Sequence, residues 1–317
     1  MTELSQVFRE PKTRNELDLV VVVPALNEKD GIAFTIDEIK AALRDVSHEI
    51  LIVDGHSQDG TDKIAKEKGA KVIYQSRTGY GDALRAGFLY IRRNMNARTT
   101  VMMDADSTYD PRDIASLVKP IFDDRADMVI GDRMARLQSG AMTRTNKTGN
   151  RLLSWVARKT LKLNVHDTQC GLRAFRTELI DDMDLNAEGM PFATEMIADA
   201  HFARARITEV PVTYRPRAGV TKLNPVKDGI RILGTIIRLV RDTKPLLFFG
   251  TASAICALLG LIFGTQVTLE WLETHTVRRI PTVVLSALLL IASILFFQLG
   301  LVADMIKGLR SRNTNRY

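Results

Sequence analysis

Thr99-Thr100-Val101-Met102-Met103-Asp104-Ala105-Asp106 carries two carboxylates, one residue apart, at the end of a short apolar run. If that run is a β-strand, the side chains of Asp104 and Asp106 point to the same face of it. Two carboxylates at a strand end suit Mg²⁺ or Mn²⁺, which prefer hard oxygen ligands and often share them with a diphosphate. The alternative is an acidic loop that merely follows a strand.

Strand and helix patterns alternate along residues 19–130. Short continuous apolar runs predict buried strands, and longer amphipathic runs bounded by caps, prolines or glycines predict helices. The expected strands are residues 19–23, 49–53, 71–74, 99–103 and 128–130, and the expected helices are residues 32–43, a segment capped by Asp59 and ended by Gly69, residues 82–94 and residues 111–122. This alternation with short loops predicts an α/β domain whose sheet is mainly parallel and covered on both faces.

Polar motifs follow three of the expected strands. They are residues 25–28 (Ala-Leu-Asn-Glu), residues 54–57 (Asp-Gly-His-Ser) and the Asp104-Ala105-Asp106 motif. Ligands of parallel α/β sheets bind beyond the carboxyl ends of the strands, so these motifs are expected at one binding site. The sequence has no Walker phosphate loop, and Gly79-Tyr80-Gly81 is only part of a dinucleotide fingerprint.

Two apolar runs, residues 245–267 and 281–303, contain no charged residue. Each exceeds the roughly 20 residues that a helix needs to cross a bilayer, so we expect a transmembrane hairpin with a loop at residues 268–280. Two buried helices of a soluble domain are the alternative. Basic residues are more frequent on the outer flanks than in the loop, which predicts a membrane protein with both ends in the cytoplasm.

The segment before the hairpin has helical periodicity with basic residues around the turn. It could pack on the domain, but its position favours an amphipathic helix in the headgroup layer. The expected organisation is a cytoplasmic domain at residues 1–224, a juxtamembrane helix at 225–244, the two spans within 245–303 and a basic tail at 304–317.

The chain of 317 residues has a formal net charge of +7, concentrated on both sides of the hairpin. An anionic membrane surface fits this distribution better than nucleic acid, for which we find no motif. The two cysteines, Cys170 and Cys256, lie far apart and form neither a disulfide framework nor a zinc pattern, which predicts a reducing compartment. The polar residues 1–15 do not resemble a secretory signal.

The motifs together resemble glycosyltransferase family 2, over roughly residues 19–307. The resemblance rests on residues 24–28, 53–61, 79–83 and 104–106, and further on residues 131–133, 168–175 and 209–214. The chain is similar to the polyprenyl- and dolichyl-phosphate sugar synthases, and most to the archaeal dolichyl-phosphate hexosyltransferases of N-glycan assembly, through residues 215–217, 221–225 and the hairpin. This resemblance implies a nucleotide-diphosphosugar transferase (GT-A type) fold, in agreement with the alternating strands.

The resemblance also implies roles by position. Asp104 and Asp106 would bind Mg²⁺ or Mn²⁺, and Arg217 and Lys222 would close over phosphates on a mobile loop. The nucleotide would contact Pro24, Leu26, Glu28, Asp54, Gly81, Asp104 and Ala105. The acceptor phosphate would be held by Arg133, Arg144, Thr148 and Arg217, and the sugar would lie near Gln169 and Glu195. Glu195 could instead cap a helix.

Two departures from the family pattern affect nucleotide choice. Gly55-His56 stands where many relatives have an acidic run, and Thr108 stands where some have Gln. The resemblance favours UDP-glucose or UDP-N-acetylglucosamine as the donor, with GDP-mannose behind. It also implies that hairpins can pair protomers into a homo-oligomer.

The sequence therefore predicts a membrane-bound, metal-dependent transferase. It would move a hexose from a nucleotide-diphosphate sugar to dolichyl or polyprenyl phosphate with inversion, and supply a lipid-linked sugar for N-glycosylation. The alternatives are a non-catalytic, transferase-like scaffold subunit and a transferase that acts on another lipid or a polymer.

Overall fold

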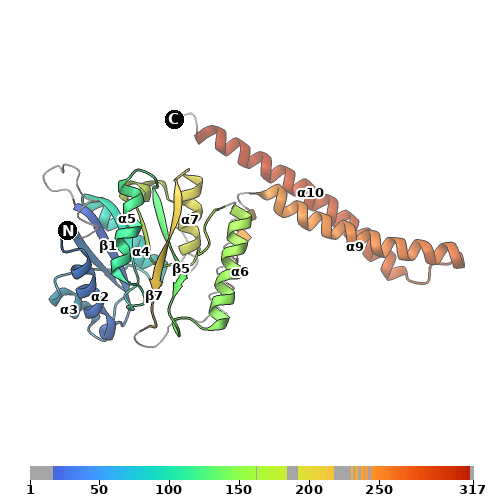
Figure 1. Ribbon diagram of the computed structural model, residues 1–317. Helices are drawn as coiled ribbons and strands as arrows, with labels where there is room; N and C mark the ends of the chain where they lie inside the picture. The colour runs from blue at the N-terminus through green and yellow to red at the C-terminus, as the bar shows by residue number, and fades with distance from the viewer. Residues whose placement is uncertain are drawn as a thin grey trace. The chain divides into compact units, whose positions relative to one another are not determined.

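The computed structural model describes residues 17–161, 163–183, 192–217 and 244–314, together with residues 230, 233, 234, 237, 238, 240 and 241 (Figure 1). The chain divides into two compact units, residues 1–235 and residues 236–317. Lys222 and most of the juxtamembrane segment predicted at 225–244 lie outside the described residues.

The first unit is built on one seven-stranded sheet with the order β3-β2-β1-β4-β6-β5-β7. Its strands are β1 (Leu17–Ala25), β2 (His48–Asp54), β3 (Lys71–Tyr74), β4 (Ala97–Met102), β5 (Met128–Leu137), β6 (Arg173–Arg176) and β7 (Ile207–Tyr214). The pairs among β1 to β4 and the pair β5–β7 are parallel, whereas β6 is antiparallel to both of its neighbours. The predicted α/β fold with a mainly parallel sheet is confirmed.

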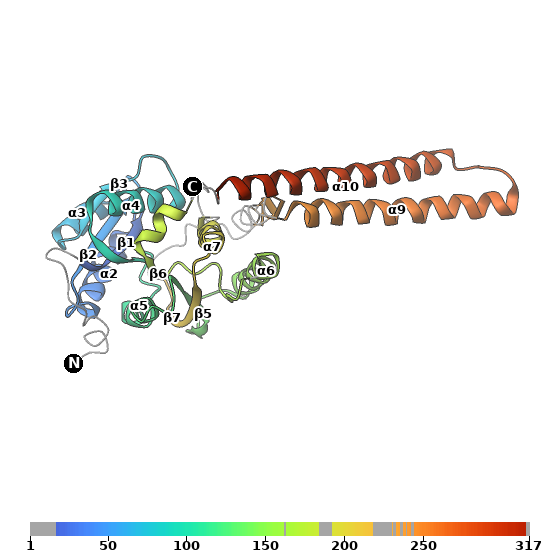
Figure 2. The same ribbon diagram turned by 90° about the horizontal axis from the view of Figure 1, so that it is seen from above.

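Helices cover both faces of this sheet. They are α2 (Lys29–Ala42), α3 (Thr61–Glu67), α4 (Tyr80–Asn94), the 3₁₀ turn η1 (Pro111–Asp113), α5 (Ile114–Phe122), α6 (Arg144–Leu161), the 3₁₀ turn η2 (Thr177–Asp182) and α7 (Phe192–Phe202). Seen from above, α4 and α7 lie on one face and α2 and α5 on the other (Figure 2). The expected helix at 111–122 begins as a 3₁₀ turn, because Pro111 fixes the backbone and Asp110 accepts a hydrogen bond from the Arg112 amide.

The core lies between the sheet and these helices. Residues 19–23 of β1 are fully buried, as expected for a central parallel strand with helices on both faces. Helix α4 packs closely on β1 at Gly87, where a Cβ atom would lie 2.7 Å from Val22 Cγ2. The close contact between α4 and the sheet fixes the position of the amino end of α4, which lies at the carboxyl ends of the parallel strands.

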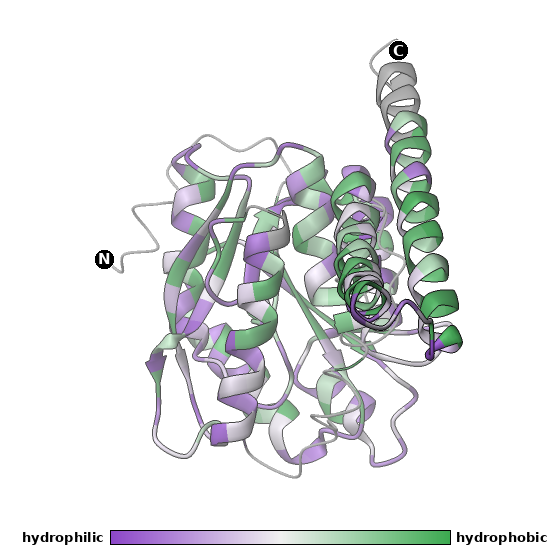
Figure 3. Cartoon of the chain, turned by 90° about the vertical axis from the view of Figure 1, so that its right-hand side faces the viewer, coloured by the Kyte–Doolittle hydropathy of each residue, from purple (hydrophilic) through white to green (hydrophobic). Residues whose placement is uncertain are grey.

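The second unit is a hairpin of two helices, α9 (Pro245–Thr274) and α10 (Ile280–Thr314). Both are long and apolar enough to cross a membrane, and hydrophobic residues predominate along them (Figure 3). They pair through small residues: Ser253 Oγ lies 3.1 Å from Ser293 Oγ, and the Ser286 hydroxyl donates to the Gly260 carbonyl at 2.8 Å. The helices extend beyond the apolar runs and leave a turn at 275–279, shorter than the loop expected at 268–280, because apolarity defines a membrane core and not the end of a helix.

Candidate active site

The three polar motifs meet at one edge of the sheet. Strand β1 pairs with β2 so that Ala25 is the partner of Asp54, and on its other side Val22 is the partner of Met102. Because all three strands are parallel, their carboxyl ends open on the same edge. The residues predicted to bind metal and nucleotide therefore lie together, as the sequence pattern indicated.

Asp104, at this edge, is a carboxylate with a raised pKa. The Tyr80 hydroxyl, at the start of α4, donates to Asp104 Oδ1 at 2.9 Å. Burial, and secondly the negative charge of Asp106, raise the pKa of Asp104 to about 6. Two adjacent carboxylates with this property are stabilised by a cation.

The loop that follows β4 is held in place by α2. Thr35 Oγ1 donates to the Ala105 carbonyl at 3.2 Å and lies 3.1 Å from Ser107 Oγ. On the other side of the loop, Asp106 Oδ1 accepts hydrogen bonds from the Thr108 hydroxyl at 2.6 Å and its amide at 3.2 Å. These contacts leave Asp106 Oδ2 directed at the site.

Arg217 bridges two acidic residues of the site. Its Nη2 lies 2.6 Å from Glu28 Oε1, and its Nη1 lies 3.2 Å from Asp106 Oδ2. Its Nε is buried and has no hydrogen-bond partner among the described residues. The structure thus brings Glu28, Asp106 and Arg217, which are far apart in sequence, into one cluster with Asp104.

The end of β2 offers a second polar contact. Asp54 is buried, and its Oδ1 accepts a hydrogen bond from the Ser57 amide at 2.8 Å. Within the described part of the chain, Asp54 Oδ2 has no hydrogen-bond partner. Leu26, 45% exposed, lies beside Gly55, where a Cβ atom would be 3.3 Å from its Cδ1. A buried acceptor next to an exposed apolar side chain suits a flat heterocycle that has an N–H group.

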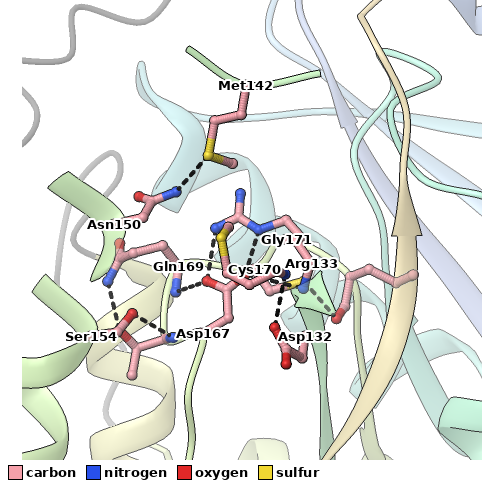
Figure 4. A network of polar contacts seen from close by, with 12 residues as sticks. Asp132, Arg133, Met142, Asn150, Ser154, Asp167, Gln169, Cys170 and Gly171 are labelled. Atoms are coloured by element: carbon pink, nitrogen blue, oxygen red, sulfur yellow. Dashed lines mark hydrogen bonds and ion pairs between the residues drawn. The ribbon is translucent and has the colours of Figure 1, made fainter. Parts of the chain in front are cut away.

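Arg133 lies in a buried ion pair (Figure 4). Its Nε and Nη2 donate to the two carboxylate oxygens of Asp167 at 2.6 and 2.8 Å, and its guanidinium lies over the Tyr214 ring at 5.3 Å. Glu209 in turn accepts the Asp167 amide at 2.8 Å. Despite the burial, which acts in the opposite direction, the negative charges around it raise the pKa of Arg133.

The other predicted acceptor residues differ from Arg133. Arg144 and Thr148 are exposed on the first turns of α6, whereas Arg133 is buried and uses Nε and Nη2 to bind Asp167. A role of Arg133 at the acceptor phosphate stays a prediction. Pro24 and Ala105 are buried at the ends of β1 and β4, and Gly81 is buried in the first turn of α4.

Gln169 and Glu195, predicted near the sugar, lie close together in the fold. The Gln169 side-chain amide donates to Thr168 Oγ1 at 3.0 Å and to Thr194 Oγ1 at 2.9 Å. Thr194 precedes Glu195 in the first turn of α7, and Glu195 is half-buried.

Several residues that shape this site are not among those predicted from the sequence. Tyr80 contacts Asp104, and Gly171 lies so close that a Cβ atom there would be 2.5 Å from Asp104 Oδ2. The Tyr109 hydroxyl accepts the Gly171 amide at 2.7 Å. Arg173 is fully buried and donates to the carbonyls of Cys170, Ala193 and Thr168. The glycines around Tyr80 and the Cys-Gly-Leu-Arg run were the available signals.

The donor set fits a divalent cation that is shared with a substrate. Among the described residues, no group of three or more His, Cys, Asp or Glu side chains is arranged to hold a metal alone. Asp104 and Asp106 would supply protein oxygens, and diphosphate and water would complete the coordination, as is usual for Mg²⁺. Such a cation would neutralise the charge of a leaving diphosphate.

Comparison with known proteins agrees with this arrangement. Residues 20–184 match the family described as glycosyl transferase family 2. The chain is 33% identical to "Glycosyltransferase AglJ" of Haloferax volcanii, over 93% of this chain and 96% of that protein. It is 35% identical to "Dolichyl-phosphate hexose transferase" of the same organism, over 72% and 96%.

A solved structure shares the fold. Glucosyl-3-phosphoglycerate synthase from Mycobacterium tuberculosis, crystallised with Mn²⁺, UDP and glucosyl-3-phosphoglycerate, superposes with a TM-score of 0.60 at 22% identity, over 76% of this chain and 84% of that one. The matched family segment runs from β1 to just past η2 and includes both site aspartates. The chain belongs to glycosyl transferase family 2, and its relatives are consistent with the archaeal N-glycan glycosyltransferases.

Proposed function

We propose that this glycosyltransferase moves a hexose from a nucleotide-diphosphate sugar to dolichyl or polyprenyl phosphate, at the cytoplasmic face of the cell membrane. The observation that carries the proposal is the cluster of Asp104, Asp106, Arg217 and Glu28 at the carboxyl edge of the sheet. One relative carries the name dolichyl-phosphate hexose transferase. Two apolar helices suit an enzyme whose acceptor cannot leave the bilayer.

The nucleotide is a uridine diphosphate in this proposal. The free oxygen of buried Asp54 can accept one N–H, and uracil offers a single imide N–H on its pairing edge. Leu26 would cover the face of the base. The structural neighbour was crystallised with Mn²⁺ and UDP, which supports the same combination here. Asp104 and Asp106 would supply the metal carboxylates.

The chemistry requires little proton transfer. A lipid phosphate is already anionic at neutral pH, so its oxygen attacks the anomeric carbon without a general base, and direct displacement inverts that carbon. Arg217, and Lys222 with it, would hold phosphate oxygens by charge-assisted hydrogen bonds, and Arg133, Arg144 and Thr148 would grip the acceptor. Alignment of both substrates supplies the rest of the rate enhancement.

The test is transfer by the full-length protein in nanodiscs. Dolichyl phosphate would be offered with UDP-glucose, UDP-N-acetylglucosamine or GDP-mannose, and with Mg²⁺, Mn²⁺ or EDTA. We expect metal-dependent formation of a glycolipid from a UDP-sugar, and a loss of about 10³-fold in Asp104→Ala and Asp106→Ala. Asp45→Ala, on the surface, is the matched control.

Three results would contradict the proposal. Turnover by both aspartate variants at the rate of the control would show that Asp104 and Asp106 do not form a metal site needed for the reaction. Absence of turnover with every donor and metal would favour a scaffold role. Product from a polymer acceptor alone would replace the lipid phosphate as the substrate.

A further inference from the structure

Arg215, the first residue after β7, holds two carboxylates at once. Its Nη1 lies 2.9 Å from Glu38 Oε2 on α2, and its Nη2 lies 2.6 Å from Asp110 Oδ2, next to η1. The Arg215 side chain is only 19% exposed. A planar guanidinium has donors on both amino groups and can bridge two carboxylates in a fixed geometry. Arg215 therefore joins helix α2 to the segment that follows β4.

The backbone of Arg215 is held as well. Its amide donates to the Thr108 carbonyl at 2.7 Å, and Tyr214 forms an isolated β-bridge with Tyr109. Pro216 follows, and a proline disfavours the helical conformation for the residue before it. Residue 215 is therefore restrained by its side chain, by its amide and by its neighbours in sequence.

Arg217, two residues further on, makes a similar bridge inside the candidate active site. It binds Glu28, which precedes α2, and Asp106, in the loop after β4. Thr108, whose carbonyl accepts the Arg215 amide, also donates its hydroxyl to Asp106 at 2.6 Å. Two residues of extended chain span about 7 Å, so the restrained position of Arg215 limits where the Arg217 guanidinium can reach.

The bridge made by Arg215 keeps its charges at neutral pH. Although burial acts in the opposite direction, hydrogen bonds from Arg112 and Arg215 lower the pKa of Asp110 to about 2. Arg112 binds Asp110 from the surface, with a side chain that is 81% exposed. Glu38 and Asp110 lie outside the predicted metal and nucleotide residues, so the entry of substrates does not require this bridge to break.

We propose that Arg215 is a positioning residue for the transferase reaction. Held between Glu38 and Asp110, it is the fixed point from which Arg217 is directed at phosphate oxygens. Arg215 itself touches neither substrate. The inference deepens the proposed function and rests on it in one respect, which is the role of Arg217 at phosphates.

The test is a double-mutant cycle on nucleotide binding, measured by calorimetry on the full-length protein in detergent with Mn²⁺. The probe is UDP, or GDP if the wild-type protein prefers it, because a nucleoside diphosphate supplies phosphate oxygens without an acceptor. Arg217→Gln removes a charge-assisted hydrogen bond, so we expect binding to weaken about tenfold. Arg215→Gln should weaken binding by a similar factor. In the Arg217→Gln background it should cost less than about twofold, because it acts through Arg217.

Two further variants accompany the cycle. Arg112→Gln is the matched control, since Arg112 binds the same Asp110 carboxylate from an exposed position, and its nucleotide affinity should equal that of the wild-type protein. Glu38→Gln retains the bond between Arg215 and Asp110, so it is the milder variant if Arg215→Gln unfolds at a lower temperature. It should weaken binding about threefold, again only while Arg217 is present.

Three results would overturn the inference. The first is unchanged nucleotide affinity in both Arg215→Gln and Glu38→Gln. The second is a loss of the same size with and without Arg217, which would indicate a merely structural role. The third is an equal loss in Arg112→Gln. Because binding needs neither a lipid acceptor nor turnover, these outcomes remain distinct from a failure of the proposed transfer to a lipid phosphate.

Discussion

At the scale of single residues, Asp104 shows how the site depends on its surroundings. Burial and the nearby Asp106 favour its protonated form, whereas the hydrogen bond from Tyr80 favours the carboxylate. A carboxyl group with a pKa of about 6 is protonated in mild acid, and a protonated carboxyl is a poor metal ligand. The Tyr80 hydroxyl therefore helps to keep a ligand available at neutral pH.

Removal of this hydroxyl should shift the pH dependence of the enzyme. In Tyr80→Phe the carboxylate loses a donor, so the pKa of Asp104 rises and the acid side of the kcat/KM profile, measured at subsaturating metal, moves to higher pH. At pH 6 we expect a loss of about tenfold. Tyr90→Phe, on the same helix, is the control, and identical profiles for the two variants would contradict this role.

Substitution of Gly171 should reduce activity as substitution of a catalytic residue does, although glycine carries no functional group. A methyl group there would lie 2.5 Å from Asp104 Oδ2 and force the carboxylate to move. Displacement of about 1 Å can cost about 10²-fold in rate, so Gly171→Ala should lose about that much kcat/KM in the transferase assay. Gly149→Ala, where a Cβ meets nothing within 4 Å, should keep its activity. Equal activity of the two variants would show that Asp104 adapts freely.

At the scale of secondary structure, the ion pair between Arg133 and Asp167 ties β5 to the segment between α6 and β6. That segment contains few regular elements, yet it supplies Gln169, Gly171 and the turn held by Arg173. Both charges are buried, and Glu209 of β7 supports the pair from the next strand. The pair therefore positions one wall of the site.

Loss of one member of this pair should destabilise the first unit. Asp167→Asn leaves a buried guanidinium without its counter-charge, and we expect a decrease of about 3–5 kcal/mol in the free energy of unfolding. Denaturant unfolding in detergent, followed by Trp155 fluorescence in a Trp271→Phe background, measures it. Asp123→Asn breaks the exposed pair with Arg125 and should cost less than about 1 kcal/mol. A decrease of less than about 1 kcal/mol in the free energy of unfolding for Asp167→Asn would rule out a structural role for the buried pair.

At the scale of the whole molecule, the chain consists of one α/β unit that carries the site aspartates and one hairpin of two helices that are long and apolar enough to cross a membrane. The hairpin buries little of its apolar surface within its own unit, because only one side of each helix faces the other. In the proposed function, acyl chains of a bilayer would cover the remaining apolar surface. Linkage to a bilayer raises the effective concentration of an enzyme near a lipid acceptor.

The proposed orientation can be tested by labelling. With both ends in the cytoplasm, the 275–279 turn lies outside, so Thr276→Cys in a Cys256→Ser background should react with an impermeant maleimide in intact cells. Ser139→Cys, exposed on the first unit, should react only after lysis. The reverse labelling pattern would show that the topology is the opposite of the proposed one and that the nucleotide-sugar site faces away from the cytoplasm.

The sequence by itself determined the class of the fold, because hydrophobic periodicity and the ends of strands depend on neighbouring residues. It located β1 to β5, the three motifs at their ends and both apolar helices. It did not predict β6, whose four residues begin and end with Arg, because the pairing partners that make this segment a strand lie far away in the chain.

Only the tertiary structure decided how charges and close contacts are arranged. It paired Arg133 with Asp167, brought Arg217 to Glu28 and Asp106, and set Gly171 against Asp104. These contacts join residues that lie tens of residues or more apart. Residue spacing carries no information about such pairs, since burial and charge act through space and not along the chain.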